Sequence, residues 1–203
     1  MNNMSINDFS ALIKKHPRVV SPNKYQSWFD EIACQLMNHF CLTANSQKYR
    51  IVECEIYYND DNHKDAITYK GNKQLLSNEW YFHLSGVDYT FGDKDSNIHA
   101  GILIRGIRKL PDEYEQKYIS GPLNVLYELL NNSDSGNITL GIEPNQSFEH
   151  TDLYKATRFG VNEGKDVSER LYRFVTELGE KHHYKDKANV KVENKVNCDN
   201  PIS

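Results

Sequence analysis

The segment RIVECEIYY, residues 50–58, constrains the fold of this chain more than any other stretch. Its residues alternate with a period of two, which predicts a β-strand. The alternation assigns Val52, Cys54 and Ile56 to one face, and Ile51, Glu53, Glu55 and Tyr57 to the other. Two carboxylates about 7 Å apart on one face of an apolar strand are costly to bury unless they are paired. The strand therefore either exposes this face at a sheet edge or carries the glutamates for a function such as general-base chemistry.

Hydrophobic spacing predicts the other elements. Apolar residues three and four positions apart predict helices at residues 5–16, 21–42 and 120–132. Short aromatic or continuous apolar runs predict further strands at residues 79–92, split by a turn at Gly86, and at 100–108 and 137–148. Residues 151–161 read as a helix or turn. We therefore expect an α+β fold with a mixed, mostly antiparallel sheet flanked by helices.

Length and composition indicate one domain in three parts. A chain of 203 residues can bury one sizeable core, whereas two full domains would be a tight fit. We expect residues 1–48 to form an N-terminal helical segment that packs on a core of residues 49–181. Residues 182–203 are charged and have few large apolar side chains, so we expect a flexible tail there.

The net charge, the cysteines and the histidines limit which ligands and partners we expect this protein to bind. A net charge of -4 gives no overall attraction to phosphates, although it does not exclude a local basic groove. The four cysteines have neither a C-x-x-C pair nor a zinc spacing, so we expect reduced thiols in a cytoplasmic protein. The eight histidines form no metal motif, and no stretch resembles a signal peptide or a membrane span. We expect no metal, cofactor or membrane partner.

Arg105, within the apolar run ILIRGI, is a further charge in a second predicted core strand. A buried guanidinium needs a carboxylate, so we expect it to pair with a glutamate on a neighbouring strand, in a structural ion pair or in a functional site. The polar segment at residues 59–79, which contains His63, is predicted to be a long loop, and long loops often carry function.

Five segments, in the same order, resemble the alkyladenine (methylpurine, or 3-methyladenine) DNA glycosylase family and cover roughly residues 49–175. RIVECEIY at 50–57 is similar to the family's RIVETEAY, and LIRGIRK at 103–109 to its LLRALEP. SGPLNVLYEL at 120–129 resembles SGPSKLCQAL, and EPNQSFEHTDL at 143–153 resembles INKSFDQRDL. RFGVNEGKDVSERLYRFV at 158–175 resembles the family's closing RVGV and WARKPLRFYV segments.

The resemblance implies the methylpurine glycosylase fold and a monofunctional hydrolase, with no lyase lysine apparent. Such an enzyme removes an alkylated or deaminated purine from double-stranded DNA in base excision repair, by water attack on the N-glycosidic bond. By the resemblance, Glu55 is the base that activates the water, Arg105 helps to hold the water, and Tyr57, His63 and Phe82 contact the extruded nucleobase. An enzyme that acts on DNA would work at the nucleoid or in the nucleus.

The chain departs from the family pattern at two places. Where the family inserts a tyrosine of YIIYG into the duplex, this chain reads FHLSG, so Leu84 or Ser85 is the candidate wedge. A family asparagine that helps to select the base corresponds to Gly92. With the acidic net charge, these departures leave two alternatives: a hydrolase of a small nucleoside or other N-glycoside, and a non-catalytic protein that binds modified bases.

Overall fold

The long strand β2 (Gln47–Asn59) lies at the centre of the fold. The structure is a computed structural model that describes residues 4–17, 21–111, 117–131, 137–145, 147–161, 164–179 and 181–198. β2 pairs along most of its length with β5 (His99–Leu110) and also pairs with β1 and β9. The strands predicted at residues 49–58 and 100–108 are thus confirmed, and they are neighbours in the sheet.

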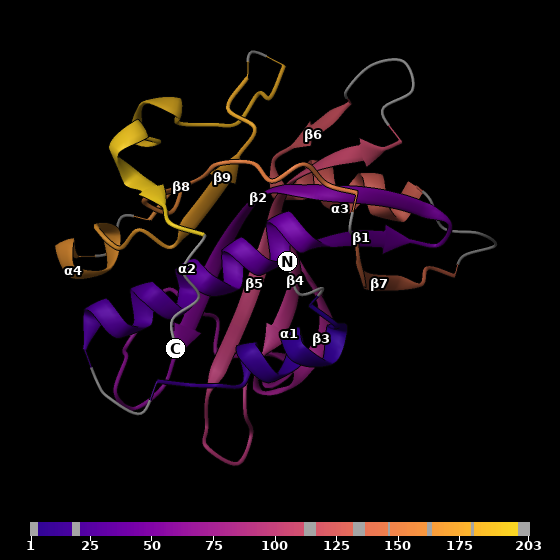
Figure 1. Ribbon diagram of the computed structural model, residues 1–203. Coiled ribbons are helices and arrows are strands. Elements are labelled where there is room, and N and C mark those ends of the chain that lie inside the picture. Colours follow the sequence, from indigo (N-terminus) through magenta and orange to yellow (C-terminus); the bar gives the residue numbers. More distant parts are fainter. Residues whose placement is uncertain are drawn as a thin grey trace.

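A ten-stranded, open sheet organises the described residues (Figure 1). Its main path runs β10-β8-β9-β2-β5-β4-β3, while β1 joins β2, β7 joins β1, and β6 joins β5. Each pairing among the named strands is antiparallel. The other strands are β1 (Phe40–Ala44), β3 (Ser77–His83), β4 (Gly86–Phe91), β6 (Tyr118–Ser120), β7 (Leu140–Pro144), β8 (Leu153–Ala156), β9 (Arg173–Thr176) and β10 (Lys195–Val196). With its helices, the sheet forms a single α+β domain, as predicted.

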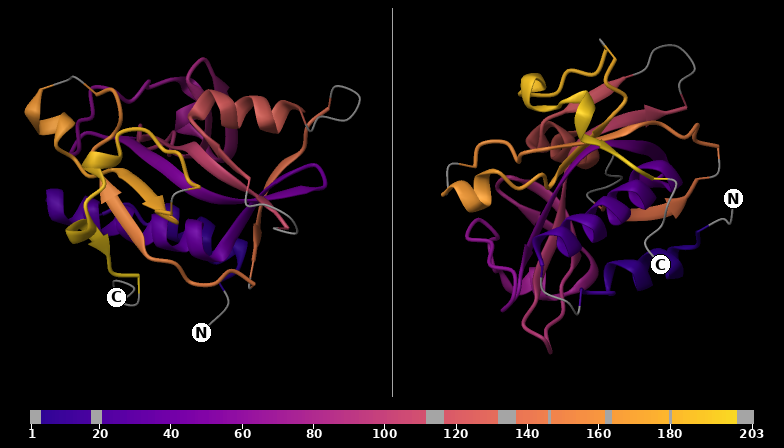
Figure 2. Two further views of the ribbon diagram at one scale, coloured as in Figure 1. Left: turned by 90° about the horizontal axis from the view of Figure 1, so that it is seen from above. Right: turned by 60° about the vertical axis from the view of Figure 1, so that its left-hand side comes forward.

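Helices cover the sheet from two sides. α1 (Ile6–Ile13) and α2 (Pro22–His39) lie on one side, and α3 (Pro122–Asn131) packs against β4 and β5 on the other (Figure 2). Shorter helical turns are α4 (Lys165–Ser168), η1 (Asn72–Leu75), η2 (Lys187–Asn189) and η3 (Val192–Asn194). No helix of the described chain is long and apolar enough to cross a membrane.

The three predicted helices are present, but their ends are corrected: the first ends at Ile13 instead of residue 16, and the third begins at Pro122 instead of residue 120. Ser5 and Ser21 cap the first two, because each hydroxyl accepts a hydrogen bond from a backbone N–H three residues on. The second helix was expected to reach residue 42, but it ends at His39. Phe40 and Leu42 continue the apolar pattern as strand residues of β1, which is held between β2 and β7.

An irregularity in β2 corrects the predicted assignment of faces. The pairing with β5 shifts register between Ile51 and Glu53 and again between Glu53 and Cys54. Ile51 therefore joins Cys54 in the main core cluster, whereas strict alternation placed Ile51 beside the glutamates. A bulge has this effect because an extra residue reverses the side-chain alternation beyond it.

β8 replaces the helix or turn expected in residues 151–161. Leu153 and Ala156 are buried three positions apart, which is a helical spacing, but here they are the two ends of a four-residue strand. β8 pairs with β9 on one side and β10 on the other. Tertiary pairing decided the outcome where local spacing was ambiguous.

The charged C-terminal segment is docked over residues 181–198, instead of forming the expected flexible tail. Tyr184, Val190 and Val196 are buried, and β10 pairs with β8. A disulfide joins Cys34 of α2 to Cys198, in place of the expected reduced thiols, while Cys41 and Cys54 are free and buried. Composition gave no sign of this docking, because a few apolar residues and one covalent bond anchor a mostly polar segment.

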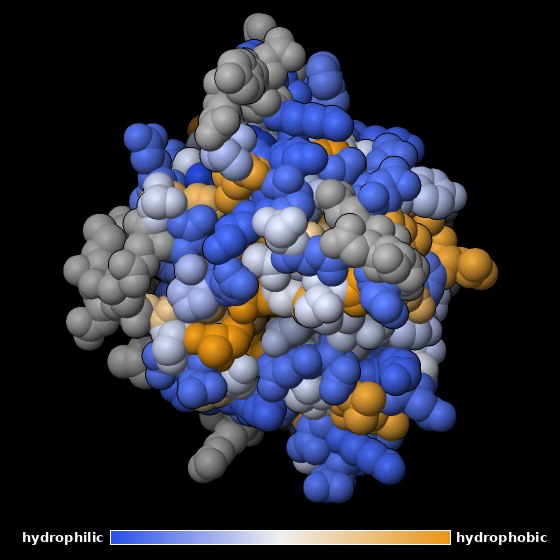
Figure 3. All heavy atoms as spheres, turned by 90° about the vertical axis from the view of Figure 1, so that its right-hand side faces the viewer, coloured by the Kyte–Doolittle hydropathy of each residue, from blue (hydrophilic) through white to orange (hydrophobic). Residues whose placement is uncertain are grey.

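Exposed apolar side chains form small groups that hydrophilic ones separate, on the face shown in Figure 3. Among the described residues, Leu123, Tyr127 and Leu130 of α3 are exposed at a helical spacing. Leu84, in the turn between β3 and β4, is 97% accessible to solvent. Phe82, near the end of β3, is also exposed. The hairpin thus projects an apolar side chain into solvent.

Candidate active site

Glu53 and Glu55 of β2 face Arg105 of β5 across the strand pair. Arg105 Nε donates to Glu53 Oε1 at 2.9 Å, and an Nη atom of the same guanidinium donates to Glu55 Oε2 at 3.3 Å. All three side chains are buried, and Glu55 is 0% exposed. The expected pairing of Arg105 with a neighbouring glutamate is confirmed, and the solvent-exposed edge is excluded for both glutamates.

Glu55 is held by three donors of different kinds. Tyr57 Oη donates to Oε2 at 2.7 Å, and the backbone N–H of Phe159 donates to Oε1 at 2.7 Å, in addition to Arg105. Burial and the negative charge of Glu55 raise the pKa of Tyr57, so this hydroxyl stays a donor. A carboxylate offers about four acceptor positions, so Glu55 can accept one more hydrogen bond, for example from a water.

Glu53 has a different set of partners. Its Oε1 accepts from Arg105 Nε and from Arg173 Nε, both at 2.9 Å. Arg173 is fully buried, and its Nη2 donates to the carbonyl of Lys185 in the docked C-terminal segment. Glu53 therefore positions two guanidinium groups, and the C-terminal segment helps to hold one of them.

A second buried ion pair packs beside this network. Arg158 makes two hydrogen bonds to Asp65, at 2.6 Å and 3.2 Å, and lies 4.9 Å from the centre of the Tyr57 ring. Arg158 also donates to the carbonyl of Ile56 on β2. These contacts tie the loop after β2 and the segment after β8 to the strand that carries Glu55.

A cavity of about 460 Å³ lies next to the hydrogen-bond partners of Glu55, and Pro122, the first residue of α3, is part of its lining. Three residues around it, Tyr57, Arg105 and Phe159, are the hydrogen-bond partners of Glu55. The other lining residues are Ile67, Tyr69, Gln74, His83, Ser85, Asp88, Leu103, Pro122, Gly160 and Val161. Flat aromatic faces, a buried arginine and a few polar groups suit a planar heterocyclic ligand.

The structure brings together most, but not all, of the residues singled out from the sequence. Tyr57, Arg105 and Ser85 line the cavity with Glu55 directly behind them. Leu84 and Phe82 are exposed on the neighbouring hairpin and do not line it.

His63 lies elsewhere, against Tyr25 of α2 at a ring distance of 4.3 Å. It lines a different cavity of about 530 Å³, and its Nε2 accepts a hydrogen bond from Arg170 at 3.1 Å. Burial, with Arg170 adding to it, lowers the pKa of His63 to about 4, so the imidazole is neutral near pH 7. The role of bracketing a base, which the resemblance gave to His63, would require it to line the cavity beside Glu55, and His63 does not line that cavity.

Several lining residues escaped the sequence analysis. Tyr69 and Gln74 come from the loop after β2, where no pattern marks single residues. Asp88 could have been found, because it is a carboxylate within the aromatic run VDYTF, the same kind of signal that marked Arg105. Among the described residues, no group of three His, Cys, Asp or Glu side chains could hold a metal ion.

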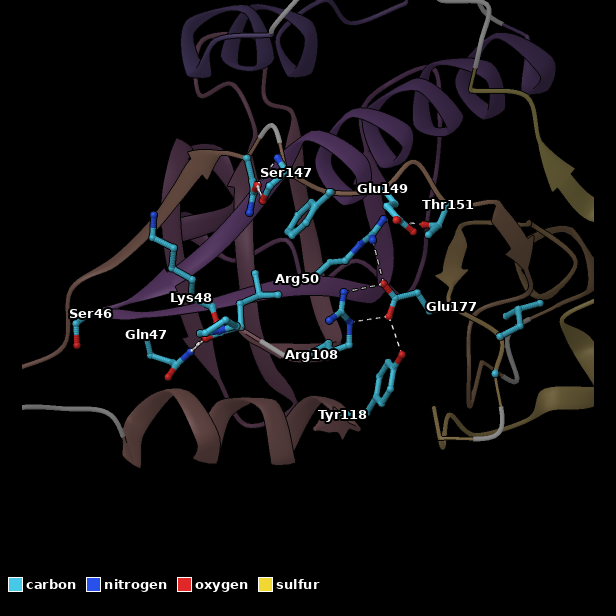
Figure 4. Close-up of a pocket in the computed structure, with 16 residues that line it drawn as sticks. Ser46, Gln47, Lys48, Arg50, Arg108, Tyr118, Ser147, Glu149, Thr151 and Glu177 are labelled. Atoms are coloured by element: carbon cyan, nitrogen blue, oxygen red, sulfur yellow. Dashed lines mark hydrogen bonds and ion pairs between the residues drawn. The ribbon is translucent and has the colours of Figure 1, made fainter. Parts of the chain in front are cut away.

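A larger cavity, of about 920 Å³, lies further along β2 and β5 (Figure 4). Arg50 and Arg108 both bind Glu177, and Tyr118 donates to the same carboxylate at 2.8 Å. Figure 4 shows these side chains converging on Glu177. The described walls of this cavity are polar, and they contain no residue that the sequence analysis singled out as a candidate for the site.

Comparison with known proteins gives one similarity and no assigned activity. No protein-family model matches the chain. The chain is similar to an uncharacterized protein of Acanthamoeba polyphaga mimivirus, with 32% identity over 127 residues. The match covers 52% of this chain and 57% of the viral protein, so the chain spans little more than half the length of that relative.

Proposed function

We propose that this protein is a DNA glycosylase-like hydrolase that removes an alkylated or deaminated purine from double-stranded DNA, as its resemblance to the methylpurine glycosylase family implies. The observation that carries the proposal is the position of Glu55, a fully buried carboxylate behind an aromatic-lined cavity. Burial of a carboxylate costs stability, and such groups are concentrated at sites where their chemistry is used.

In the proposed reaction, Glu55 accepts a proton from a water molecule while the water oxygen forms a bond to C1′ of the sugar. The bond between C1′ and the base nitrogen breaks, and its electron pair leaves with the base. Arg105 and Tyr57 hold the Glu55 carboxylate in place, and Arg105 also lies at the cavity wall, where it can orient the water. No lysine is among the described residues that line the cavity, which supports a hydrolase without lyase activity.

When the target nucleotide is extruded, a side chain of the enzyme fills the space that it leaves in the duplex. Leu84 is the candidate wedge, because it projects from the β3–β4 turn beside Ser85, a residue of the cavity wall. A leucine can fill an apolar gap between base pairs, although it cannot stack as a tyrosine does.

The test is excision from a duplex that carries one hypoxanthine. We expect release by the wild type and a loss of at least about 100-fold in Glu55→Gln, because a neutral amide cannot accept the proton. Glu143→Gln is the matched control, since Glu143 is an exposed partner of Lys48 and should keep the wild-type rate.

Each other outcome separates the proposal from its alternatives. Equal rates in the wild type and Glu55→Gln would refute the role of Glu55. Cleavage of free nucleosides, with none from the duplex, would support hydrolysis of small N-glycosides. Binding of bases without any turnover would support a non-catalytic base-binding protein.

A further inference from the structure

The wall of the 460 Å³ cavity contains a carboxylate that the proposed reaction does not use. Asp88 of β4 is 2% exposed and lines the cavity together with His83 and Gln74. His83 Nε2 lies 3.0 Å from Asp88 Oδ1, and Gln74 Nε2 donates to Asp88 Oδ2 at 3.2 Å. The three side chains come from three different elements, β4, β3 and η1.

The hydrogen bonds define where the protons lie. The backbone N–H of Ser85 donates to His83 Nδ1 at 3.2 Å, so Nδ1 carries no proton. The other ring nitrogen, Nε2, is the one that faces Asp88. The Gln74 amide donates to the second oxygen of the same carboxylate. Within the described chain, no lysine or arginine forms an ion pair with Asp88, so its side-chain partners are an imidazole and an amide.

The backbone leaves space for this carboxylate. Gly101 of β5 lies next to Asp88, and a Cβ atom at that position would come within 2.9 Å of Asp88 Oδ2. Any larger residue at 101 would displace the Asp88 carboxylate from its present contacts. The absence of a side chain at Gly101 thus allows the Asp88 carboxylate to keep its present position.

Asp88 and Glu55 lie in one row across three strands. Leu103 of β5 is in register with Glu55 on β2 and with Asp88 on β4. Residues directly opposite one another in antiparallel strands point to the same face, so the three side chains lie on the cavity side of the sheet. Asp88 and Leu103 line the cavity, and Glu55 lies behind its lining partners Tyr57, Arg105 and Phe159. Two strand spacings, about 10 Å, separate the backbone positions of the carboxylates. A planar base held over Leu103 would have its glycosidic bond toward Glu55 and its far edge toward Asp88.

We propose that Asp88 is a specificity-determining residue that selects nucleobases with an N–H donor on the edge that enters the cavity. The inference rests on the proposed function, because it assumes that the cavity holds a base. An ionised carboxylate only accepts hydrogen bonds, and a base without a donor would leave it partly unsatisfied in a buried wall. Adenine and hypoxanthine derivatives with a free edge are accepted, whereas 1,N6-ethenoadenine, whose added ring blocks that edge, is disfavoured.

Binding of two small probes tests this without relying on catalysis. The probes are 9-methyladenine, which has an amino donor on the far edge, and the 9-methyl derivative of 1,N6-ethenoadenine, which has none. Titration calorimetry on the full chain should give at least about tenfold tighter binding of 9-methyladenine. Asp88→Asn should bring the ratio close to one, while Asp95→Asn, which removes an exposed aspartate of the same charge, should keep it.

The outcomes distinguish this inference from the proposed function. Equal binding of both probes by the wild type, or an unchanged ratio in Asp88→Asn, would overturn the role of Asp88 and leave a base-binding cavity. No binding of either probe by the folded wild type would overturn both proposals. If Asp88→Asn does not fold, Asp88→Ser removes the charge without adding bulk, and the same ratio is measured.

Discussion

The disulfide between Cys34 and Cys198 allows a quantitative prediction about how the C-terminal segment is held. The two cysteines are separated by 164 residues, so the bond closes most of the chain into one loop. A loop of that length corresponds to about 5 kcal/mol of chain entropy removed from the unfolded state. Cys198→Ser should therefore lower the free energy of unfolding by up to about this amount. For a chain of this size, that lowers the melting temperature by on the order of 10 °C.

Thermal unfolding followed by circular dichroism, with and without dithiothreitol, measures the effect. The reductant should lower the melting temperature of the wild type to that of Cys198→Ser and leave the variant unchanged. The double variant with Cys34→Ser should match the single one, because both changes break the same bond.

A thiol titration of the unfolded, non-reduced protein provides an independent check. It should find Cys41 and Cys54 free and the other two cysteines absent from the count. Four reactive thiols in the wild type, together with a melting temperature that does not respond to reductant, would refute the tether.

Two further predictions concern buried charges. Arg173→Met should lower the free energy of unfolding, measured in urea, by about 3–5 kcal/mol, because Glu53 loses a buried partner. The control Lys48→Met removes an exposed ion pair and should cost less than about 1 kcal/mol. Equal effects of the two changes would contradict the stabilising role of the buried pair between Arg173 and Glu53. His63, whose pKa is about 4 when folded and near 6.5 when unfolded, contributes stability that is full above pH 6.5 and is lost as the pH falls toward 4, by about 3 kcal/mol. An NMR titration of the imidazole with a midpoint near 6.5 in the folded protein would show that His63 is not buried as described.

Much of the fold could be predicted because its strands and helices carry strong local patterns. β2, β5 and α2 bury long apolar runs, and the pattern of each run is dictated by its own geometry. The position of Ile51 could not be predicted, since a bulge depends on the partner strand. The docking of residues 181–198 likewise depends on a disulfide to a helix 164 residues away.

The candidate site shows the same limit at the level of single residues. Arg105 and Glu55 were identified because a charge within an apolar strand is costly and therefore has a partner. His63 was assigned by its place in a similar sequence, whereas its position in the structure, against Tyr25 of α2, depends on the path of the long loop after β2. Asp88 satisfies the criterion that identified Arg105, so physical cost is a better guide to this cavity than sequence position.

The two glutamates of β2 differ because their partners differ, although they lie two residues apart on one strand. Both guanidinium contacts of Glu53 converge on one oxygen at 2.9 Å, so Glu53 holds Arg105 and Arg173 together. Glu55 has one longer arginine contact at 3.3 Å and two neutral donors. It is therefore less fully neutralised, and only this carboxylate adjoins the cavity-lining residues Tyr57 and Phe159. Under the proposed function, a structural glutamate beside a reactive one explains why a core strand carries two carboxylates: the first holds the arginine that contacts the second.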